Sequence, residues 1–331
     1  MTSNVVIKSI SSYHPENIVD NEFFLEHFSK QGKDVSGLLE SLGRKKRYIS
    51  KNKSENSLTM GILSAKKALK ESNLKGKDMD MIVFSSGTPE YTSPASAIII
   101  HKEIEGKSDT ITYDINANCV GMVIAIDQVS NYMLSKPKMK YALVVGSEQV
   151  HRFSRSEDPV TYANFGDASC AIILERVETT DSGYVDSAYY TKSTSAYEIM
   201  LPSCGLSKLY EEQISDYDRR CMWEANANNG FTSTVDSINT LLKDNCLTKD
   251  NISLYCFSQL SKSNLKIICD NLGEDFNKFH YIGDEYGYTG TSSPFITLEE
   301  AIKHNKISRG QYVVFWSIGA GSTACTMLFR Y

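Results

Sequence analysis

The chain has 331 residues, of which 41% are apolar and 23% charged, and its formal net charge is −5. This composition is typical of a globular protein, and the acidic balance, with a pI near 5.8, argues against nucleic acid as a partner. No apolar run approaches the roughly 20 residues that span a bilayer, and the first residues lack a signal-peptide pattern. We therefore expect a cytoplasmic protein without a membrane segment.

Short β-like runs alternate with helical patterns along the first half of the chain. Strands are predicted at residues 79–86, 111–115, 141–148 and 169–176, and helices at 93–106 and 120–134. Ser93 is expected to cap the first of these helices, with Pro94 in its first turn.

A similar order returns in the second half. Strands are predicted at residues 252–258, 279–283, 311–319 and 323–331, and helices at 263–273 and 293–305. The segment 177–230, rich in Ser, Tyr and Asn, is interpreted as an insertion that joins the halves. Two successive αβ units of similar length, 1–176 and 177–331, indicate an internal structural duplication.

Eight cysteines are spread along the chain without a C-x-x-C pair. This spacing argues against a zinc site and against a disulfide framework, and most of these residues are expected to be reduced, buried thiols. No cluster of ligand residues predicts a metal, and no dinucleotide fingerprint predicts a nucleotide cofactor.

Cys119 differs from the other cysteines because it stands between the predicted strand 111–115 and the predicted helix 120–134. A turn at such a boundary projects the side chain into a cleft, and the start of the helix favours a thiolate. The first N–H groups of the helix can also donate to an oxyanion. The position by itself is also compatible with an ordinary buried thiol that has no catalytic role.

The motifs around Cys119 add a family resemblance. The stretches "SSGTPEYTSP", "DINANCVGM", "VVGSEQ", "NFGDASCAIILE" and "SIGAGSTA" occur in the order and spacing of β-ketoacyl-acyl-carrier-protein synthase III. The resemblance covers the whole chain. It implies the thiolase fold, in which two duplicated α/β halves form a five-layered αβαβα sandwich, and a homodimer. It also implies an acyl-CoA or acyl carrier protein thioester as substrate, with no further cofactor.

By this resemblance Cys119 accepts the acyl group. Its own N–H and that of Ala320 in "GAGS" then form the oxyanion hole, with alanine where the family has glycine. A plain tight turn is the alternative interpretation of "IGAGS".

Two family positions are changed in this sequence. Ser258 in "SQLS" stands where the family has a histidine, and Tyr288 in "GYTG" stands where it has an asparagine. In the family these two side chains polarise malonyl-carrier protein while it loses carbon dioxide. One such donor is worth ~2.7–4 kcal/mol, so their loss predicts weak decarboxylation unless the two hydroxyls substitute. Acyl loading is expected to survive, because the helix start can raise the thiolate fraction of Cys119 without a histidine.

Positions that recognise the substrate differ as well. Gly37 and Ser41 replace the tryptophan and arginine that hold the adenine of coenzyme A in the family, which predicts weak CoA binding. Ser93 replaces a large aromatic residue at the end of the acyl pocket, so we expect room for an acyl group larger than acetyl.

Three charged or titratable positions have two interpretations each. His151 follows the strand 141–148, so it either lines the substrate pocket and assists a base step or is an exposed loop histidine. Lys262 and Lys266 either meet an acidic carrier protein or belong to a solvated helix face.

Three functions remain open from the sequence. The first is an acyltransferase that takes an acyl group onto Cys119 and passes it to an acceptor, in fatty acid, secondary metabolite or glycan biosynthesis. The second is decarboxylative C–C condensation supported by Ser258 and Tyr288. The third is a non-catalytic partner subunit of an active homologue. Retention of Cys119 argues against the third, and loss of both helper residues argues against the second.

Overall fold

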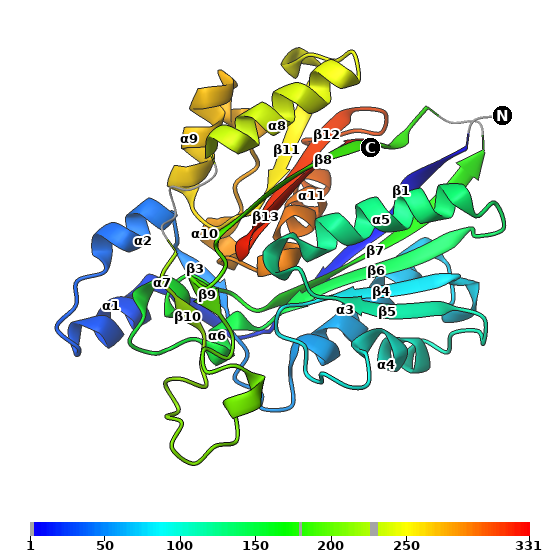
Figure 1. Cartoon of the computed structure of the whole chain (residues 1–331). Helices are drawn as coiled ribbons and strands as arrows, with labels where there is room; N and C mark the ends of the chain where they lie inside the picture. The colour runs from blue at the N-terminus through cyan, green and yellow to red at the C-terminus, as the bar shows by residue number, and fades with distance from the viewer. Residues whose placement is uncertain (1–2, 179–180, 226–230) are drawn as a thin grey trace.

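The computed structural model describes residues 3–178, 181–225 and 231–331, and two mixed β-sheets run through it (Figure 1). The first sheet has the order β1 (Ser3–Tyr13), β7 (Ala168–Glu178), β6 (Tyr141–Glu148), β4 (Met81–Ser85), β5 (Ile111–Ile115). The second has the order β11 (Ile252–Phe257), β12 (Tyr312–Gly319), β13 (Gly321–Arg330), β8 (Gly183–Ser195). In the first sheet β4 is parallel to β5 and β6, and β7 is antiparallel to both of its neighbours.

Six helices complete three further layers (Figure 1). The outer helices of the first sheet are α3 (Ser57–Ser72) and α4 (Ser96–Glu103), and those of the second are α8 (Phe231–Asp244) and α9 (Lys262–Leu272). Between the sheets lie α5 (Gly121–Ser135) and α11 (Ser293–Lys303). A buried apolar cluster joins each pair of neighbouring layers. Strands buried on both faces, such as β4, explain the continuous apolar runs of the sequence. The predicted five-layered sandwich is confirmed.

The two sheets share one strand order, which makes the duplication visible. Strands β1, β7, β6 and β4 correspond in order and direction to β8, β13, β12 and β11. Because β8 is a full strand of the second sheet, the interpretation of 177–230 as a mere insertion is wrong for residues 183–195.

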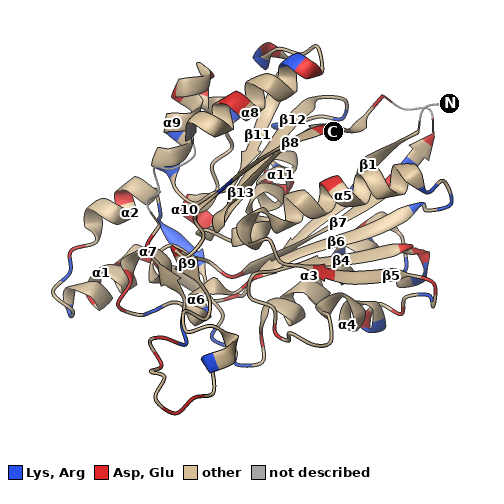
Figure 2. Cartoon of the chain, viewed as in Figure 1, with Lys and Arg blue, Asp and Glu red and all other residues tan. Residues whose placement is uncertain are grey.

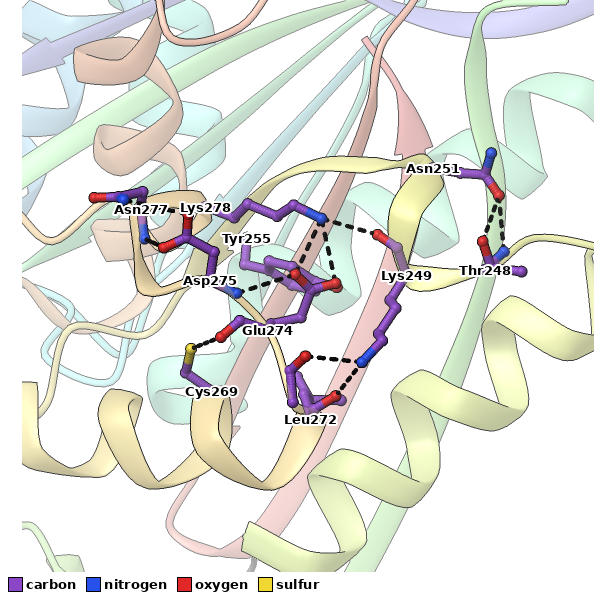
Figure 3. A network of polar contacts seen from close by, with 11 residues as sticks. Thr248, Lys249, Asn251, Tyr255, Cys269, Leu272, Glu274, Asp275, Asn277 and Lys278 are labelled. Atoms are coloured by element: carbon purple, nitrogen blue, oxygen red, sulfur yellow. Dashed lines mark hydrogen bonds and ion pairs between the residues drawn. The ribbon is translucent and has the colours of Figure 1, made fainter.

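The second sheet has no counterpart of β5 among the described residues, so the predicted strand 279–283 is wrong. Phe279 makes an isolated parallel bridge to Tyr255 of β11, next to the turn η5 (Phe276–Lys278). Polar contacts cover this edge (Figure 3): the Tyr255 hydroxyl donates to Glu274 at 3.3 Å, and Lys278 lies 3.0 Å from the same carboxylate. A covered edge is protected from pairing with another chain.

Helix α4 begins at Ser96 rather than at the predicted Ser93. The carboxylate of Asp114, on neighbouring β5, accepts the N–H groups of Ser96 and Ala97 at 2.6 and 2.8 Å. This contact from another element replaces a local side-chain cap, which explains why the local sequence misplaced the helix start.

Short elements connect the strands and the longer helices of the sandwich. Those before β7 are β2 (Ile18–Asp20), α1 (Asn21–Ser29), α2 (Ser36–Leu42), β3 (Lys46–Tyr48), η1 (Gly76–Asp78), η2 (Asn118–Val120), α6 (Val150–Phe153) and α7 (Pro159–Tyr162). Those after β8 are β9 (Ile199–Met200), η3 (Leu206–Lys208), β10 (Met222–Trp223), η4 (Lys249–Asn251), α10 (Gly283–Tyr286) and η6 (Gly290–Ser292).

Candidate active site

A cavity of about 190 Å³ opens where the carboxyl ends of β4, β5 and β6 meet the hairpin between β12 and β13. Gly87 follows β4, Cys119 follows β5, and Glu148 ends β6, so three neighbouring strands each bring a residue to the cavity. Such edges are the usual ligand sites of α/β sheets. The remaining wall comes from Tyr288 and from the segment between β8 and α8.

The backbone around Cys119 is fixed by both halves of the molecule. Asn118 adopts φ +53°, a left-handed conformation that asparagine tolerates, and this turns the chain from β5 into η2. The Ser317 hydroxyl donates to the carbonyl of Cys119 at 2.7 Å, and the N–H of Met122 donates to Thr291 Oγ1 at 2.8 Å. Cys119 is therefore held just before the start of α5, where the sequence predicts it.

Cys119 lines the cavity, and the residue is partly buried. Burial among its neighbours, followed by the negative charge of Glu148, raises the pKa of Cys119 to about 12, although a hydrogen bond from Tyr288 lowers it. This direction contradicts the expectation that the helix start alone enriches the thiolate. Desolvation outweighs the helix N-terminus, so the resting group is a thiol.

Tyr288 and Ser258 form a buried pair next to Cys119. Their hydroxyl oxygens lie 2.8 Å apart, and the Tyr288 hydroxyl faces the Cys119 thiol closely enough to lower the pKa of that thiol as a donor. Tyr288 lines the cavity, whereas Ser258 does not. Burial and the nearby thiol keep the pKa of Tyr288 well above its usual value, so its hydroxyl stays protonated and can donate. The two residues thus form a chain of hydroxyls that ends at the sulfur.

The Tyr288 backbone is anchored to the loop before β7. Its N–H donates to the carbonyl of Asn164 at 2.9 Å, and its carbonyl accepts the N–H of Gly166 at 3.0 Å. Two buried arginines hold this loop in turn: Arg44 donates to Asn164 Oδ1 at 2.8 Å, and Arg47 donates to the carbonyl of Ala163 at 2.8 Å. Tyr288 is therefore held rigidly over the nucleophile.

Glu148 is a site residue that the sequence reasoning missed. The Gly87 N–H donates to Oε1 at 3.0 Å and the Thr88 hydroxyl donates to Oε2 at 2.8 Å. Burial raises the pKa of Glu148 to about 7 despite these hydrogen bonds. A carboxylate at the very end of a predicted parallel strand, inside the quoted motif "VVGSEQ", was the signal that could have identified it.

Three more lining residues had no signal in the sequence. Glu198, Cys221 and Trp223 come from the segment between β8 and α8, and they reach the cavity only through long-range folding. Cys221 is buried, and its presence contributes to the raised pKa of Cys119.

Ala320 lies in the turn between β12 and β13 and lines the cavity together with Cys119. This placement is what the oxyanion-hole prediction requires, and the role itself stays a prediction. Its neighbour Gly319 passes so close to Ala117 that an added Cβ would lie 2.4 Å from the carbonyl oxygen. The close approach requires glycine there.

His151 does not line the cavity, and it is half-buried in α6 (Val150–Phe153) rather than exposed in a loop. Its ring packs against Tyr162, with 4.6 Å between ring centroids, and its Nδ1 lies 3.1 Å from the Tyr162 carbonyl. The chain turns into α6 directly after β6, and the ring packs there against α7 (Pro159–Tyr162). Ser93 is exposed and lies outside the cavity within a single chain, so its role at an acyl pocket stays a prediction.

Lys262 and Lys266 line an open groove between α2 and α9, together with Gly37 and Ser41. Figure 2 shows basic residues on α9 and β3 at this end of the molecule. Arg44 forms part of the groove and donates to the carbonyl of Leu260, which lines the cavity. The groove therefore lies next to the cavity.

Within residues 3–178, 181–225 and 231–331, no helix is long and apolar enough to cross a membrane. The same residues contain no group of three or more His, Cys, Asp or Glu side chains arranged to hold a metal ion.

Comparison with known proteins agrees with this architecture. The model of the family 3-oxoacyl-[acyl-carrier-protein (ACP)] synthase III matches residues 113–193, and the model of its C-terminal part matches residues 242–331. A β-ketoacyl-[acyl-carrier-protein] synthase III of Clostridium novyi is 27% identical, with 97% of each chain covered.

Two solved structures show the thiolase fold of this chain. The 3-oxoacyl-[acyl-carrier-protein] synthase III of Aquifex aeolicus superposes with a TM-score of 0.85 at 24% identity, and 100% of each chain is covered. OleA of Xanthomonas campestris, crystallised with lauric acid and lauroyl-CoA, superposes with a TM-score of 0.84 at 16% identity, and 99% of each chain is covered.

Proposed function

Because the chain belongs to the 3-oxoacyl-[acyl-carrier-protein] synthase III family, we propose that it takes an acyl group from a CoA or carrier-protein thioester onto Cys119 and passes it to an acceptor. Membership makes the chain an enzyme of the transferase kind. The observation that carries the finer proposal is the position of Cys119 at the cavity, hydrogen-bonded to Tyr288.

In the loading step the Cys119 sulfur attacks the thioester carbonyl, the bond to the donor sulfur breaks, and the thiol proton ends on the departing thiol. The Tyr288 hydroxyl supports the attacking sulfur because it donates to it and stays protonated. The N–H groups of Cys119 and Ala320 are the proposed donors to the oxyanion, each worth ~2.7–4 kcal/mol in such sites.

Decarboxylative condensation is the weaker candidate. The Tyr288–Ser258 pair lies where the family resemblance puts an asparagine and a histidine, and Tyr288 separates Ser258 from the cavity. None of the chain's histidines is among the residues described as lining the cavity. A malonyl group at Cys119 therefore meets a single phenol rather than two polarising groups.

The groove beside the cavity is the proposed docking place for the donor. Lys262 and Lys266 offer positive charge to an acidic carrier protein, whereas Gly37 and Ser41 provide neither a stacking ring nor a cation for adenine. A carrier-protein donor is thus favoured over free coenzyme A. We also propose a homodimer, as the resemblance implies, and a place in fatty acid, secondary metabolite or glycan biosynthesis.

The test is to incubate the protein with acetyl, octanoyl and lauroyl thioesters of CoA and of a carrier protein, and to weigh the intact chain by mass spectrometry. An added acyl mass that is absent in Cys119→Ala supports the proposal. Because Cys246 is exposed, the Cys246→Ala variant controls for labelling at a surface thiol. Adding malonyl-carrier protein to the loaded enzyme then separates transfer from condensation. No loading by any donor would overturn the proposal and favour a non-catalytic partner subunit.

A further inference from the structure

The cavity around Cys119 is acidic. Glu148 and Glu198 line it, and the lining residues that the structure describes include no lysine, arginine or histidine. An anionic substrate group, such as a malonyl carboxylate, would lose water beside these carboxylates without gaining a counter-charge. A cationic group gains attraction in the same place. The negative charge of the cavity therefore favours a cationic acceptor over an anionic one.

Glu148 is placed to accept a proton at the reacting sulfur. The Gly87 N–H and the Thr88 hydroxyl fix the orientation of the carboxylate at the cavity. The group also lies close enough to Cys119 for its charge to act on the thiol. Cys119 and Tyr288 are the titratable groups that face it, and neither brings a positive charge. Its pKa of about 7 suits a base that works near neutral pH.

Glu198 is placed to bind a cation. Its backbone is fixed because the carbonyl accepts the N–H of Glu224 at 2.7 Å, next to the paired strands β9 and β10. Its side chain is half-buried at the cavity and forms neither a hydrogen bond nor an ion pair with any described residue. A carboxylate in a confined cavity that has no partner among the described residues gains more from an incoming ammonium group than one that is already paired.

Building on the proposed acyl transfer, we propose that the acceptor is a primary amine, which enters as an ammonium ion held by Glu198 and loses a proton to Glu148 before it attacks acyl-Cys119. The free amine forms the C–N bond with the acyl carbon, and the C–S bond breaks. The second amine proton reaches the departing sulfur through the Tyr288 hydroxyl. The products are an amide, the Cys119 thiol and one proton, which Glu148 returns to water.

The raised pKa of Cys119 fits this sequence of steps. A thiolate of high pKa is a poor leaving group unless it is protonated as it departs, and Tyr288 is the donor in contact with it. The contact of Tyr288 with the Cys119 sulfur, which assists loading of the acyl group, therefore also assists its release.

The experiment separates this inference from the proposed function by using enzyme that is already acylated. The protein is loaded with the best thioester, freed of donor and mixed with butylamine or with butanol, which has nearly the same shape without the charge. Loss of the acyl mass and formation of N-butyl amide or butyl ester are followed, with the rates corrected for the same acceptors acting on a small free thioester. After correction we expect butylamine to discharge the enzyme at least tenfold faster than butanol. Equal corrected rates would overturn the inference while leaving the acyl-enzyme in place.

Two isosteric variants identify the roles. Glu148→Gln is expected to slow discharge by butylamine about 10²-fold, since a positioned base contributes ~10²–10⁴-fold. The same variant should load faster, because it removes a charge that raises the pKa of Cys119. Opposite effects on the two steps are not expected of a structural defect.

Glu198→Gln should raise the butylamine concentration for half-maximal discharge, and this effect should be larger than its effect on discharge by butanol. Wild-type discharge should also rise with pH through about 7 and then level off, whereas Glu148→Gln should keep rising as the amine itself deprotonates. Unchanged discharge in both variants would overturn the inference.

Discussion

The two halves of the molecule share one strand order, but they bring different chemistry to the cavity. The first half supplies Cys119, Gly87 and Glu148 from the carboxyl ends of three neighbouring strands. The second half supplies the hydroxyl pair Tyr288–Ser258, in positions where the family resemblance has an amide and an imidazole. A nucleophile can thus be kept while the groups that activate the second substrate change.

The same contrast appears in the sheets. The first sheet keeps β5, whose end leads into Cys119, whereas the second reduces the equivalent strand to the Tyr255–Phe279 bridge. The edge left by that loss is covered by Glu274 and Lys278 rather than by a strand (Figure 3). Among the described residues, the sheet that leads into Cys119 has five strands and the other sheet has four.

The largest expected effect tests the first half. Replacing Cys119 with alanine removes the sulfur that accepts the acyl group, so acyl loading should fall below detection in the intact mass. Cys246→Ala should load like the wild type, because Cys246 is exposed and distant in the fold from the cavity lining. Loading that persists in Cys119→Ala would place the nucleophile elsewhere.

Two substitutions separate the contributions of Tyr288 and Ser258 to acyl loading. Tyr288→Phe removes the donor to the Cys119 sulfur and should slow loading about 10²-fold, as the loss of one positioned donor typically does. Ser258→Ala removes a group that touches only the far side of Tyr288, so it should slow loading less than about tenfold. Mass spectrometry of samples quenched at successive times gives both loading rates. Equal effects would mean that the pair acts as one unit and that Tyr288 has no separate role.

Restoring the family residues tests whether the second half decides the reaction. The double variant Ser258→His with Tyr288→Asn should release labelled carbon dioxide from malonyl-carrier protein at least tenfold faster than the wild type, since two such donors contribute several kcal/mol (~2.7–4 each). Each single variant serves as the matched control. If the double variant is no faster, the acidic cavity rather than the missing pair prevents decarboxylation.

The pH dependence of Cys119 reports on Glu148. Because the pKa of Cys119 is raised to about 12, its alkylation by iodoacetamide should increase about tenfold per pH unit from 7 to 9 without a plateau. In Glu148→Gln the pKa should fall, so alkylation at pH 8 should be several-fold faster. A plateau near pH 8 in the wild type would show that the thiol ionises more easily than its burial implies.

The sequence was sufficient for the parts of the fold that depend on local patterns. Strands 111–115 and 141–148 were predicted at their observed bounds. For 141–148 the reason is that a strand buried on both faces has a continuous apolar run. The start of α4 and the missing fifth strand were mispredicted, since Asp114 and Glu274 act from other elements. A local sequence pattern does not predict contacts that come from other elements.

The site residues also divide into those that a local sequence pattern signals and those that it does not. The strand–helix boundary at Cys119 was predicted because it is a local feature, whereas the proposed role of Cys119 came from the family resemblance. Glu148 was within reach of the local argument. Glu198 enters the cavity through the path of a long connection, which no local pattern encodes. His151 was misplaced for the converse reason: its position after β6 was right, but the turn into α6 sets where its ring points.

The smallest expected effect concerns the groove that lies beside the cavity. Lys262→Glu and Lys266→Glu should each raise the concentration of acyl carrier protein for half-maximal loading by about threefold, because an exposed ion pair contributes ~0.2–1 kcal/mol. The effect should shrink in high salt, where exposed charges are screened. Lys77→Glu, an exposed lysine outside the groove, is the matched control. If all three variants load alike, the two lysines belong to a solvated helix face, and the donor must approach the cavity from another side.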